Sequence, residues 1–476
     1  MPNQPNQPVK PGRPSIGRTP NTVSENVPKE SQRKRLLAAM TQLASSKGYA
    51  ETSIADLTAG AGVSRQTFYE LFTGKQECLL AAYQQAAGRV FEQIESIVAA
   101  GDGWETPARV AEAILTQADE DPETAWLFYV ESLAATRMGT GRRRAQKQFE
   151  SFSEAFLDRA PADGLTLDVP PIALLGAIRS IVASRLRSNA SDQLPGLAED
   201  LTAWMRSYAA PARRPRWSTG EHAALAPRRS QSPPAPTAPR PQPLPRGRHG
   251  LPRVVVARNR YERIVHATAE AAQAKGYLEM TVGDIVVAAG IGRDVFYRHF
   301  TDKQHAFAAA HQYGAQETFA AFARAFFTAE EWPERIWNGL STLTSIMSRE
   351  PALAHLQLVE PYAAGAQAIQ RSEQTIATFA VFLEEGYRHR PEAGELPHLC
   401  STAISHAVFE TIRSRIEREG AGELPRHLPQ LGYIAIAPFT GSEAAVKLVE
   451  EFAERAPVST TLAERGHDSN HAVPPA

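Results

Sequence analysis

Cysteine is nearly absent from this 476-residue chain, and the two that occur, Cys78 and Cys400, lie far apart in the sequence. Two isolated cysteines provide neither a disulfide framework nor the paired spacing of a zinc site. Such scarcity is typical of a reducing compartment, so we expect a cytoplasmic protein.

Long apolar runs and an excess of one charge are missing too. No run of about 18 apolar residues occurs, which predicts no transmembrane helix and no membrane partner. The net charge of −1 argues against a chain that coats nucleic acid non-specifically, but it allows a sequence-specific binder with local positive charge. A hydrophobic content of 43% supports packed cores, and the length suffices for two or three domains.

Catalytic signatures are also missing. No Ser, His and Asp arrangement stands out, and no glycine-rich phosphate loop follows a strand pattern. His299, His305 and His311 are six residues apart and therefore point about 120° apart on a helix, which is poor geometry for a metal. The sequence predicts that the protein is not an enzyme and has no metal and no cofactor.

What is present is an internal repeat. Residues 47–76 and 275–304 align without a gap at an offset of 228, and 14 of the 30 aligned residues are identical. Chance does not produce such a match, so the chain contains a duplicated unit.

Each copy has the pattern of a helix-turn-helix. A capping box opens the first helix, formed by a hydroxyl residue and an aspartate three positions later. The capping residues are Ser53, Asp56, Thr281 and Asp284. A glycine break then precedes a short second helix, at 64–72 in copy one and 292–300 in copy two. Two helices joined by such a turn fit a DNA-reading motif whose second helix enters the major groove.

The order K-G-Y, capping box, A-G-V-S-R-x-x-F-Y-x-x-F-x-x-K resembles the DNA-binding domain of the tetracycline-repressor (TetR) family over residues 31–85 and 259–313. This resemblance implies an all-α fold with two tandem TetR-like units. Each unit would comprise a three-helix helix-turn-helix DNA-binding domain and a helical ligand-binding and dimerisation domain. The implied function is sequence-specific transcriptional regulation, with repression that responds to a small molecule, on a double-stranded DNA operator.

The resemblance also implies which residues face DNA. In copy one they are Ser53, Ser64, Arg65, Gln66, Thr67, Tyr69 and Lys75. In copy two they are Thr281, Arg293, Asp294, Tyr297, Arg298, His299 and Lys303. Arginine forks onto guanine or phosphate, glutamine pairs with adenine, and lysine neutralises phosphates. The phenylalanines of the second helix are expected to pack the small core instead: Phe68, Phe72, Phe296 and Phe300.

Copy two departs from the family at two positions. Gly292 stands where the family has Ser, so a hydroxyl is lost, and Asp294 places a negative charge on the surface that should meet DNA. One alternative is therefore a ligand sensor or interaction protein without specific DNA binding.

Domain boundaries follow from composition and from the repeat. The linker carries 11 prolines and 8 arginines in 42 positions and cannot form a core. Helix 1 of each copy is expected at about 31–47 and 259–275. The expected segments are a disordered arm (1–30), helix-turn-helix domain 1 (31–90), regulatory domain 1 (91–210), the linker (211–252), helix-turn-helix domain 2 (253–318), regulatory domain 2 (319–456) and a disordered tail (457–476).

The duplication extends beyond the helix-turn-helix. Arg185 and Leu194-Pro195 match Arg415 and Leu424-Pro425 at an offset of 230. A usual TetR-family regulator needs two chains to present two DNA-reading helices about 34 Å apart, whereas this chain carries both. We therefore expect the halves to associate as an intramolecular pseudo-dimer on an operator with unlike half-sites. The expected interface pairs 172–187 and 197–208 with 401–417 and 442–455.

A flexible 42-residue linker permits this, since its r.m.s. span is about 35 Å. The alternative is a homodimer of tandem chains in which one DNA-reading helix is degenerate. In either arrangement the resemblance implies an unknown small apolar effector. Its pocket is expected near Trp126, Tyr129, Phe149, Phe152, Leu356 and Phe379.

Overall fold

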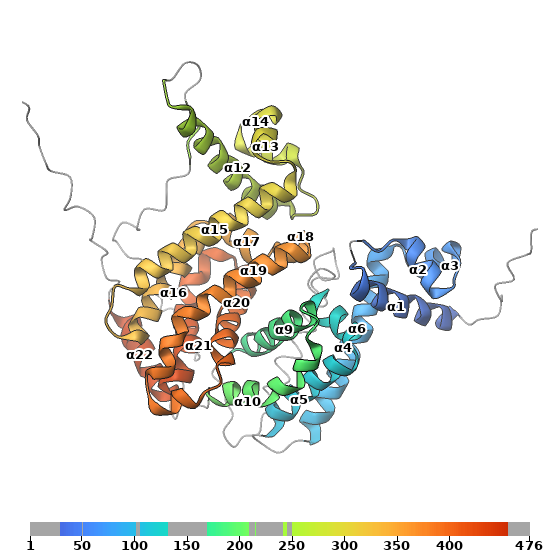
Figure 1. Ribbon diagram of the computed structural model, residues 1–476, viewed down its shortest axis with the longest axis horizontal. Helices are drawn as coiled ribbons and strands as arrows, with labels where there is room; N and C mark the ends of the chain where they lie inside the picture. Colours follow the sequence, from blue (N-terminus) through green and yellow to red (C-terminus); the bar gives the residue numbers. More distant parts are fainter. Residues whose placement is uncertain are drawn as a thin grey trace, which may run out of the picture.

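The computed structural model describes residues 29–49, 51–100, 105–131, 169–208, 215, 241–244 and 250–455. These residues form α-helices with short 3₁₀ and π segments, and no strand occurs among them. The predicted all-α fold with two tandem units is confirmed (Figure 1).

The first half begins with three short helices and continues into longer ones. Its elements are α1 (Lys29–Ser46), α2 (Ile54–Ala61), α3 (Arg65–Leu71), α4 (Lys75–Ala100), α5 (Glu105–Glu120), α6 (Pro122–Ala125), the π segment η1 (Trp126–Val130), α9 (Pro171–Arg187), the 3₁₀ segments η2 (Ser191–Gln193) and η3 (Pro195–Leu197), and α10 (Ala198–Arg206).

The second half repeats this order. Its elements are α12 (Arg253–Lys275), α13 (Val282–Ala289), α14 (Arg293–His299), α15 (Lys303–Phe326), α16 (Trp332–Arg349), α17 (Pro351–Leu358), α18 (Pro361–Ala364), α19 (Ala366–Phe379), η5 (Ala380–Arg388), η6 (Pro391–Glu395), α20 (Leu399–Glu419), η7 (Ala421–His427), α21 (Leu428–Thr440) and α22 (Ser442–Glu454).

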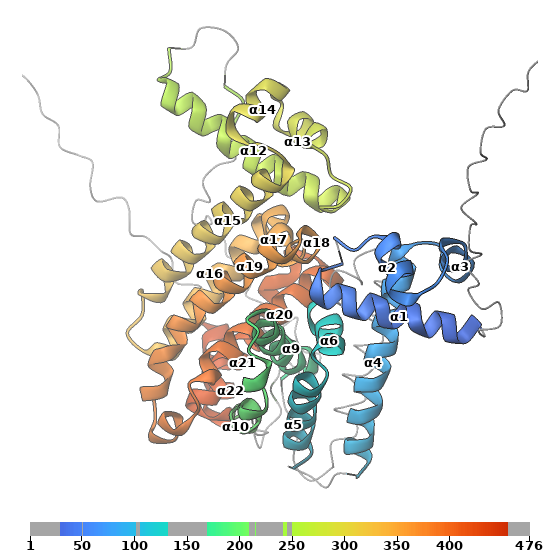
Figure 2. The same ribbon diagram turned by 45° about the vertical axis from the view of Figure 1, so that its right-hand side comes forward.

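Two small three-helix domains project from a larger helical body. Helices α1–α3 lie at the right of Figure 1 and α12–α14 at its top, and the long helices α4 and α15 connect each to the body. The two small domains are also separate from each other in the turned view of Figure 2. We call α1–α3 and α12–α14 domain N1 and domain N2.

Helix 1 of domain N2 is longer than the sequence predicted. It starts at Arg253, directly after Pro252, and not near Asn259. Proline has a fixed φ and no amide hydrogen, so it suits the position just before a helix, where an amide would have no carbonyl partner. The prediction was wrong because the repeat was aligned on residues around the turn, which say nothing about extra turns upstream.

The core joins the two halves. One continuous cluster of buried apolar residues runs through domain N1, the body helices of the first half and those of the second half. Domain N2 has a separate cluster, which includes Ile264, Ile285 and Phe296 and extends to Leu353 and Leu356 of α17.

Helices near the end of each half meet at the centre of the molecule. Helix α9 lies along α20, and α10 also contacts α20 (Figures 1 and 2). The Tyr208 hydroxyl, just after α10, donates to the Ile434 carbonyl of α21 at 2.8 Å. Trp204, Tyr208 and Tyr433 are fully buried there.

The expected partner of α10 has to be corrected. At the offset of 230, residues 198–206 correspond to α21 (428–436) and not to the final helix at 442–455. Residues 428–440 were not predicted as a helix because they contain Pro429 and Pro438. Pro429 occupies the first turn of α21, where proline is tolerated. Helix α22 packs instead against α21 and α16 of its own half.

Candidate nucleic-acid interface

Helices α2 and α13 begin with the predicted capping boxes. Ser53 Oγ accepts from the Asp56 amide at 3.1 Å, while Asp56 Oδ2 accepts from the Ser53 amide at 2.8 Å. Thr281 and Asp284 form the same pair of bonds in domain N2. Both hydroxyls also donate to the aspartate, at 2.8 Å each, so Ser53 and Thr281 are engaged within the cap itself.

A lysine on helix 1 completes each cap. Lys47 Nζ lies 2.7 Å from Asp56 Oδ2, and Lys275 Nζ lies 2.6 Å from Asp284 Oδ1. These lysine hydrogen bonds, with those from Ser53 or Thr281, hold the pKa of Asp56 well below its usual range and lower the pKa of Asp284 to about 2.

These caps should make domain N2 acid-sensitive. Because the folded-state pKa of Asp284 is depressed, its stabilisation is present above the unfolded pKa of about 4 and is lost as the pH falls toward about 2. We expect Asp284→Asn to lower the unfolding temperature of domain N2 near neutral pH, and this difference should shrink as the pH falls and vanish below about pH 2. Circular dichroism melts across pH measure it. Asp192→Asn, on the exposed surface of the first half, is the control, and an equal effect from it would refute the assignment.

Glycines make the turn between the two helices. Gly62 has φ 60° and ψ 41°, and Gly290 has φ 60° and ψ 43°, a left-handed conformation that L side chains rarely adopt. The amide of Val63 donates to the Thr58 carbonyl and that of Ile291 to the Val286 carbonyl, which closes the ends of α2 and α13. The predicted glycine break is thus present in both copies.

The second helices bury one face and expose the other. Phe68 and Phe296 are fully buried, and Phe72 and Phe300 nearly so, as the sequence predicted. Tyr69 is 49% exposed and Tyr297 is 57% exposed. The predicted DNA-facing residues that share this exposed surface are Ser64, Arg65, Gln66 and Tyr69 in α3 and its cap, and Arg293, Asp294, Tyr297 and Arg298 in α14. Thr67 and His299 are half-buried.

Exposed side chains on α3 contact one another. The Arg65 guanidinium lies over the Tyr69 ring, 5.8 Å from its centroid. Gln66 Nε2 donates to Glu70 Oε1 at 3.1 Å. Both contacts are on the surface and easily exchanged for bonds to a ligand.

The start of α14 differs from that of α3. Ser64 Oγ accepts from the Thr67 amide at 3.0 Å, whereas Gly292 offers no side-chain cap. A Cβ at Gly292 would lie 2.5 Å from Asp294 Oδ1, so a serine there would require the exposed Asp294 carboxylate to move. The two departures from the family pattern therefore lie next to each other at the start of α14.

Asp294 does not leave α14 with an unbalanced negative charge. Its carboxylate pairs with Arg298 at 2.9 Å, one turn further on. An aspartate in the first turn also interacts favourably with the positive end of the helix dipole. Arg293 remains as an exposed cation beside this pair.

His299 provides a weaker cation than its sequence position suggested. Its ring packs against Tyr261 and Phe300, with centroids 6.4 and 6.3 Å away. Partial burial and the neighbouring Arg260 and Arg298 charges lower the pKa of His299, so the ring is neutral at pH 7.

Lys75 and Lys303 have partners within the protein. Lys75 Nζ donates to the Tyr49 and Thr52 carbonyls at 2.9 and 2.7 Å and lies 4.3 Å from the Tyr49 ring centroid. Lys303 does the same with the carbonyls of residues 277, 278 and 280. Burial lowers the pKa of both lysines. These contacts give each lysine a structural role at the end of helix 1.

A carboxylate from the body holds the same loop in each half. Glu131 Oε1 accepts from the Tyr49 amide at 3.2 Å, and Glu360 Oε2 accepts from the Tyr277 amide at 2.8 Å. We call Glu131 and Glu360 the latch carboxylates. They were visible in the sequence only as a matched Val-Glu pair at an offset of 229, which signalled duplication but no role.

Removal of a latch carboxylate should loosen the small three-helix domain that it holds. Glu360→Ala leaves the buried Tyr277 amide without an acceptor, at a cost of about 1–3 kcal/mol. We expect the Tyr277 amide to exchange with solvent faster in hydrogen-exchange measurements. Glu360→Gln is the matched control, because its side-chain oxygen still accepts; equal exchange rates in the two variants would contradict the latch.

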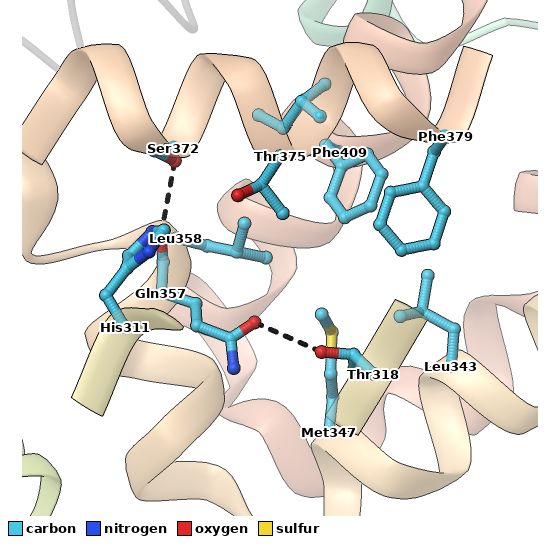
Figure 3. A pocket seen from close by; sticks show the side chains of 11 residues that line it. His311, Thr318, Leu343, Met347, Gln357, Leu358, Ser372, Thr375, Phe379 and Phe409 are labelled. Atoms are coloured by element: carbon cyan, nitrogen blue, oxygen red, sulfur yellow. Dashed lines mark hydrogen bonds between the residues drawn. The ribbon is translucent and has the colours of Figure 1, made fainter. Parts of the chain in front are cut away.

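Three small cavities in the second half share lining residues. The central cavity is lined by polar groups of His311, Thr318, Gln357, Ser372 and Thr375 on one side and by Leu343, Phe379 and Phe409 on the other (Figure 3). Thr318 Oγ1 donates to Gln357 Oε1 at 3.4 Å, and Ser372 Oγ donates to the Gln357 carbonyl at 3.3 Å. Burial lowers the pKa of His311 to about 4, so this imidazole is neutral.

The two outer cavities extend this space in opposite directions. One shares Leu343, Phe379 and Phe409 and continues among Phe322 and Phe382. The other shares Thr318, Met347 and Gln357 and reaches His266 of α12. The free volumes are about 10, 30 and 40 Å³, far below the roughly 300 Å³ that a typical small-molecule site needs.

The residues predicted to line one effector pocket lie in different parts of the molecule. Phe379 lines two of these cavities. Leu356 is buried against domain N2, and Trp126 and Tyr129 pack in the core of the first half. Phe149 and Phe152 lie outside the described residues.

Within the described ranges, no group of three or more His, Cys, Asp or Glu side chains is placed to hold a metal ion. None of the helices in that part of the chain combines the length and apolarity needed to cross a membrane.

Comparisons with known proteins point to the two small domains. A family model described as bacterial regulatory proteins, tetR family, matches residues 36–82 and again residues 264–310. The HTH-type transcriptional regulator EthR of Mycolicibacterium smegmatis is 27% identical over 164 residues, which span 34% of this chain and 64% of that protein. The match therefore covers just under two thirds of this relative.

Two solved structures also align. The fatty acid degradation regulator FadR from Bacillus halodurans has 16% identity, covers 40% of this chain and all of its own (100%), and gives a TM-score of 0.30. A TetR-family transcriptional regulator from Syntrophomonas wolfei has 13% identity, covers 44% of this chain and 99% of its own, and gives a TM-score of 0.29.

Proposed function

The chain belongs to the TetR family of transcriptional regulators, in tandem form, and from this premise we propose that its two halves act as one intramolecular pseudo-dimer on DNA. One observation carries the proposal: α9 and α10 of the first half pack against α20 of the second, and the Tyr208 hydroxyl after α10 donates to the Ile434 carbonyl of α21. One chain thus contains two DNA-binding domains and a contact that joins their bodies. A family member with a single unit needs a second copy for the same purpose.

The operator of such a pseudo-dimer has unlike half-sites. Helix α3 offers Arg65, Gln66 and Tyr69, while α14 offers Arg293 and the Asp294–Arg298 pair. Arginine and glutamine match different base edges in the major groove, and an arginine paired to an aspartate presents a different surface again. Each half therefore selects its own sequence, and the operator need not be a palindrome.

A small, largely apolar effector regulates DNA binding in this proposal. Thr318 and Gln357 contribute polar groups to the lining of two of the three cavities of the second half. On one side of them the lining is aromatic, and on the other it reaches His266 of α12. Because these cavities are too small for such a molecule, an effector has to separate the surrounding helices when it binds. It shifts the protein only as far as its affinities for the two arrangements differ.

Helix α17 connects these cavities with domain N2. Gln357 on α17 lines two cavities, and Glu360, three residues later, holds the Tyr277 amide. Helix α17 also packs on α12 directly. An effector that moves α17 therefore repositions domain N2 relative to domain N1 and releases the operator, which corresponds to repression relieved by the effector.

Single arginine substitutions should separate the two half-sites. Arg65→Ala is expected to weaken contacts at one half-site and Arg293→Ala at the other, each by about 1–3 kcal/mol, because each removes one forked contact to a base or phosphate. Footprinting at constant salt, since affinity depends steeply on salt, measures both.

Arg324→Ala, an exposed change on α15 away from both domains, is the control and should leave the footprint unchanged. If Arg65→Ala and Arg293→Ala weaken the same half-site, the pseudo-dimer assignment is wrong. If neither changes affinity, α3 and α14 do not read DNA.

A further inference from the structure

A network of buried charges crosses the contact between the halves. Glu410 of α20, only 4% exposed, lies between two arginines. Arg179 of α9 in the first half approaches its Oε1 at 2.6 Å, and Arg413 of α20 approaches its Oε2 at 2.6 Å. Arg413 also reaches Glu417 at 2.8 Å. The first half therefore contributes a cation that the carboxylate of the second half requires.

A second ion pair crosses the same contact. Arg187, at the end of α9, pairs with Glu373 of α19. Both side chains are largely buried, at 15% and 18% exposure. In both of these ion pairs, an arginine of the first half contacts a glutamate of the second half.

The contact is also shaped sterically. A Cβ built on Gly176 of α9 would lie 2.9 Å from both Cβ and Cγ of Glu410. Real Cβ atoms do not approach so closely, so only glycine allows α9 to lie this near to α20 at that point.

The duplication shows what would stand at these positions if like halves paired. At the offset of 230, Gly176 corresponds to His406, Arg179 to Phe409 and Ser180 to Glu410. Paired with a copy of itself, α20 would bring His406 against Glu410, where even a methyl group has no room. It would also replace the Arg179 guanidinium by a phenyl ring and leave the carboxylate without its cross-half cation.

Pairing of the first half with its own copy fails for electrostatic reasons. Residues 171–187 contain three arginines (179, 185 and 187) and no acidic residue. At the offset of 230, Glu410 corresponds to Ser180, so two α9 helices in contact would bury Arg179 without its carboxylate partner. An unpaired buried charge costs several kcal/mol, so this association is strongly disfavoured.

We infer that this interface selects the unlike half as its partner, so that each first half binds a second half and neither binds its own kind. The inference rests on the proposed pseudo-dimer and identifies its specificity determinants as Gly176, Arg179, Arg187, Glu373 and Glu410. The linker tethers the halves at an effective concentration in the millimolar range, so the partner is the second half of the same chain.

The test starts from the folded full-length chain with a specific protease site placed in the linker between residues 216 and 240. Before cleavage, native mass spectrometry should give a single chain of 51.9 kDa. After cleavage, it should give a 1:1 complex of the two unlike fragments, also after dilution and mixing with isotope-labelled fragments. Complexes of two like fragments, or a stable dimer of uncleaved chains, would overturn the inference.

Charge reversal keeps the test specific for the interface. Arg187→Glu should raise the dissociation constant of the cleaved fragments by about tenfold or more, and Arg187→Glu combined with Glu373→Arg should restore most of the affinity. Arg185→Glu makes the same charge change on the same helix, but Arg185 bonds Gln193 within its own half, so binding should be unaffected. An equal loss of affinity in Arg187→Glu and Arg185→Glu would contradict a specific role of the Arg187–Glu373 pair. So would a double variant whose affinity is not restored. None of these readouts involves DNA, so they succeed or fail independently of operator binding.

Discussion

Glu410→Ala is expected to destabilise the protein by about 3–5 kcal/mol. The change removes one carboxylate and leaves two guanidinium groups, those of Arg179 and Arg413, buried at the contact between the halves. Arg413 keeps Glu417, but Arg179 loses the partner that lies across the interface. Urea unfolding followed by circular dichroism measures the loss.

Glu419→Ala is the matched control for this experiment. Glu419 lies on the same helix and pairs with Arg415, but it is 35% exposed and both residues belong to the second half. Its loss should cost no more than about 1 kcal/mol, as is usual for surface pairs. Equal costs for the two variants would mean that the buried network does not hold the halves together.

The pH dependence of Glu410→Ala provides an independent check. Burial raises the pKa of Glu410, but the Arg179 and Arg413 charges outweigh burial and hold the pKa below its usual range. Its stabilisation is therefore present above the ordinary glutamate pKa of about 4 and is lost as the pH falls through the lowered folded-state pKa. The free energies of unfolding of wild type and Glu410→Ala should converge in acid.

Phe68→Ala is expected to unfold domain N1, at a cost of about 3–5 kcal/mol. Phe68 is fully buried and contacts the Phe72 and Tyr69 rings, with centroids 5.8 and 5.5 Å away. Because domain N2 has a separate cluster of buried residues, it should stay folded. Hydrogen exchange localises the loss to residues 29–72, and the footprint should lose one half-site only.

Tyr69→Ala, next to Phe68, tests DNA contact without a large change in protein stability. Tyr69 is 49% exposed, so its removal should leave the unfolding temperature nearly unchanged and weaken operator binding. Phe296→Ala and Tyr297→Ala repeat the comparison in domain N2. Loss of both half-sites in Phe68→Ala, with the second half still folded, would show that the domains do not bind independently.

The helix-turn-helix domains were predictable because their signals are local. A capping box, a glycine in left-handed conformation and phenylalanines one turn apart each depend on residues within one or two turns, so the sequence carries them directly. The same helix-turn-helix pattern occurs twice in the chain, which supported the prediction for each copy. The burial of Phe68 and exposure of Tyr69 follow from the same helical spacing.

Contacts between distant segments could not be predicted in the same way. Lys75 was expected to face phosphate, yet it bonds the carbonyls of residues 49 and 52, whose position depends on how α4 packs against α1. The latch carboxylates act across more than 80 residues, so no local pattern shows their partners. Helix α21 was missed because its two prolines concealed an otherwise apolar helix.

In the proposed pseudo-dimer, one chain presents two different DNA-reading helices to one operator. Selection from a random double-stranded DNA library with the full-length protein, at about 150 mM salt, tests it most directly. The account predicts a single asymmetric motif with two unlike halves about one helical turn apart. A palindromic motif would contradict it and indicate two chains that each use one helix, and the absence of any enriched motif would contradict sequence-specific regulation altogether.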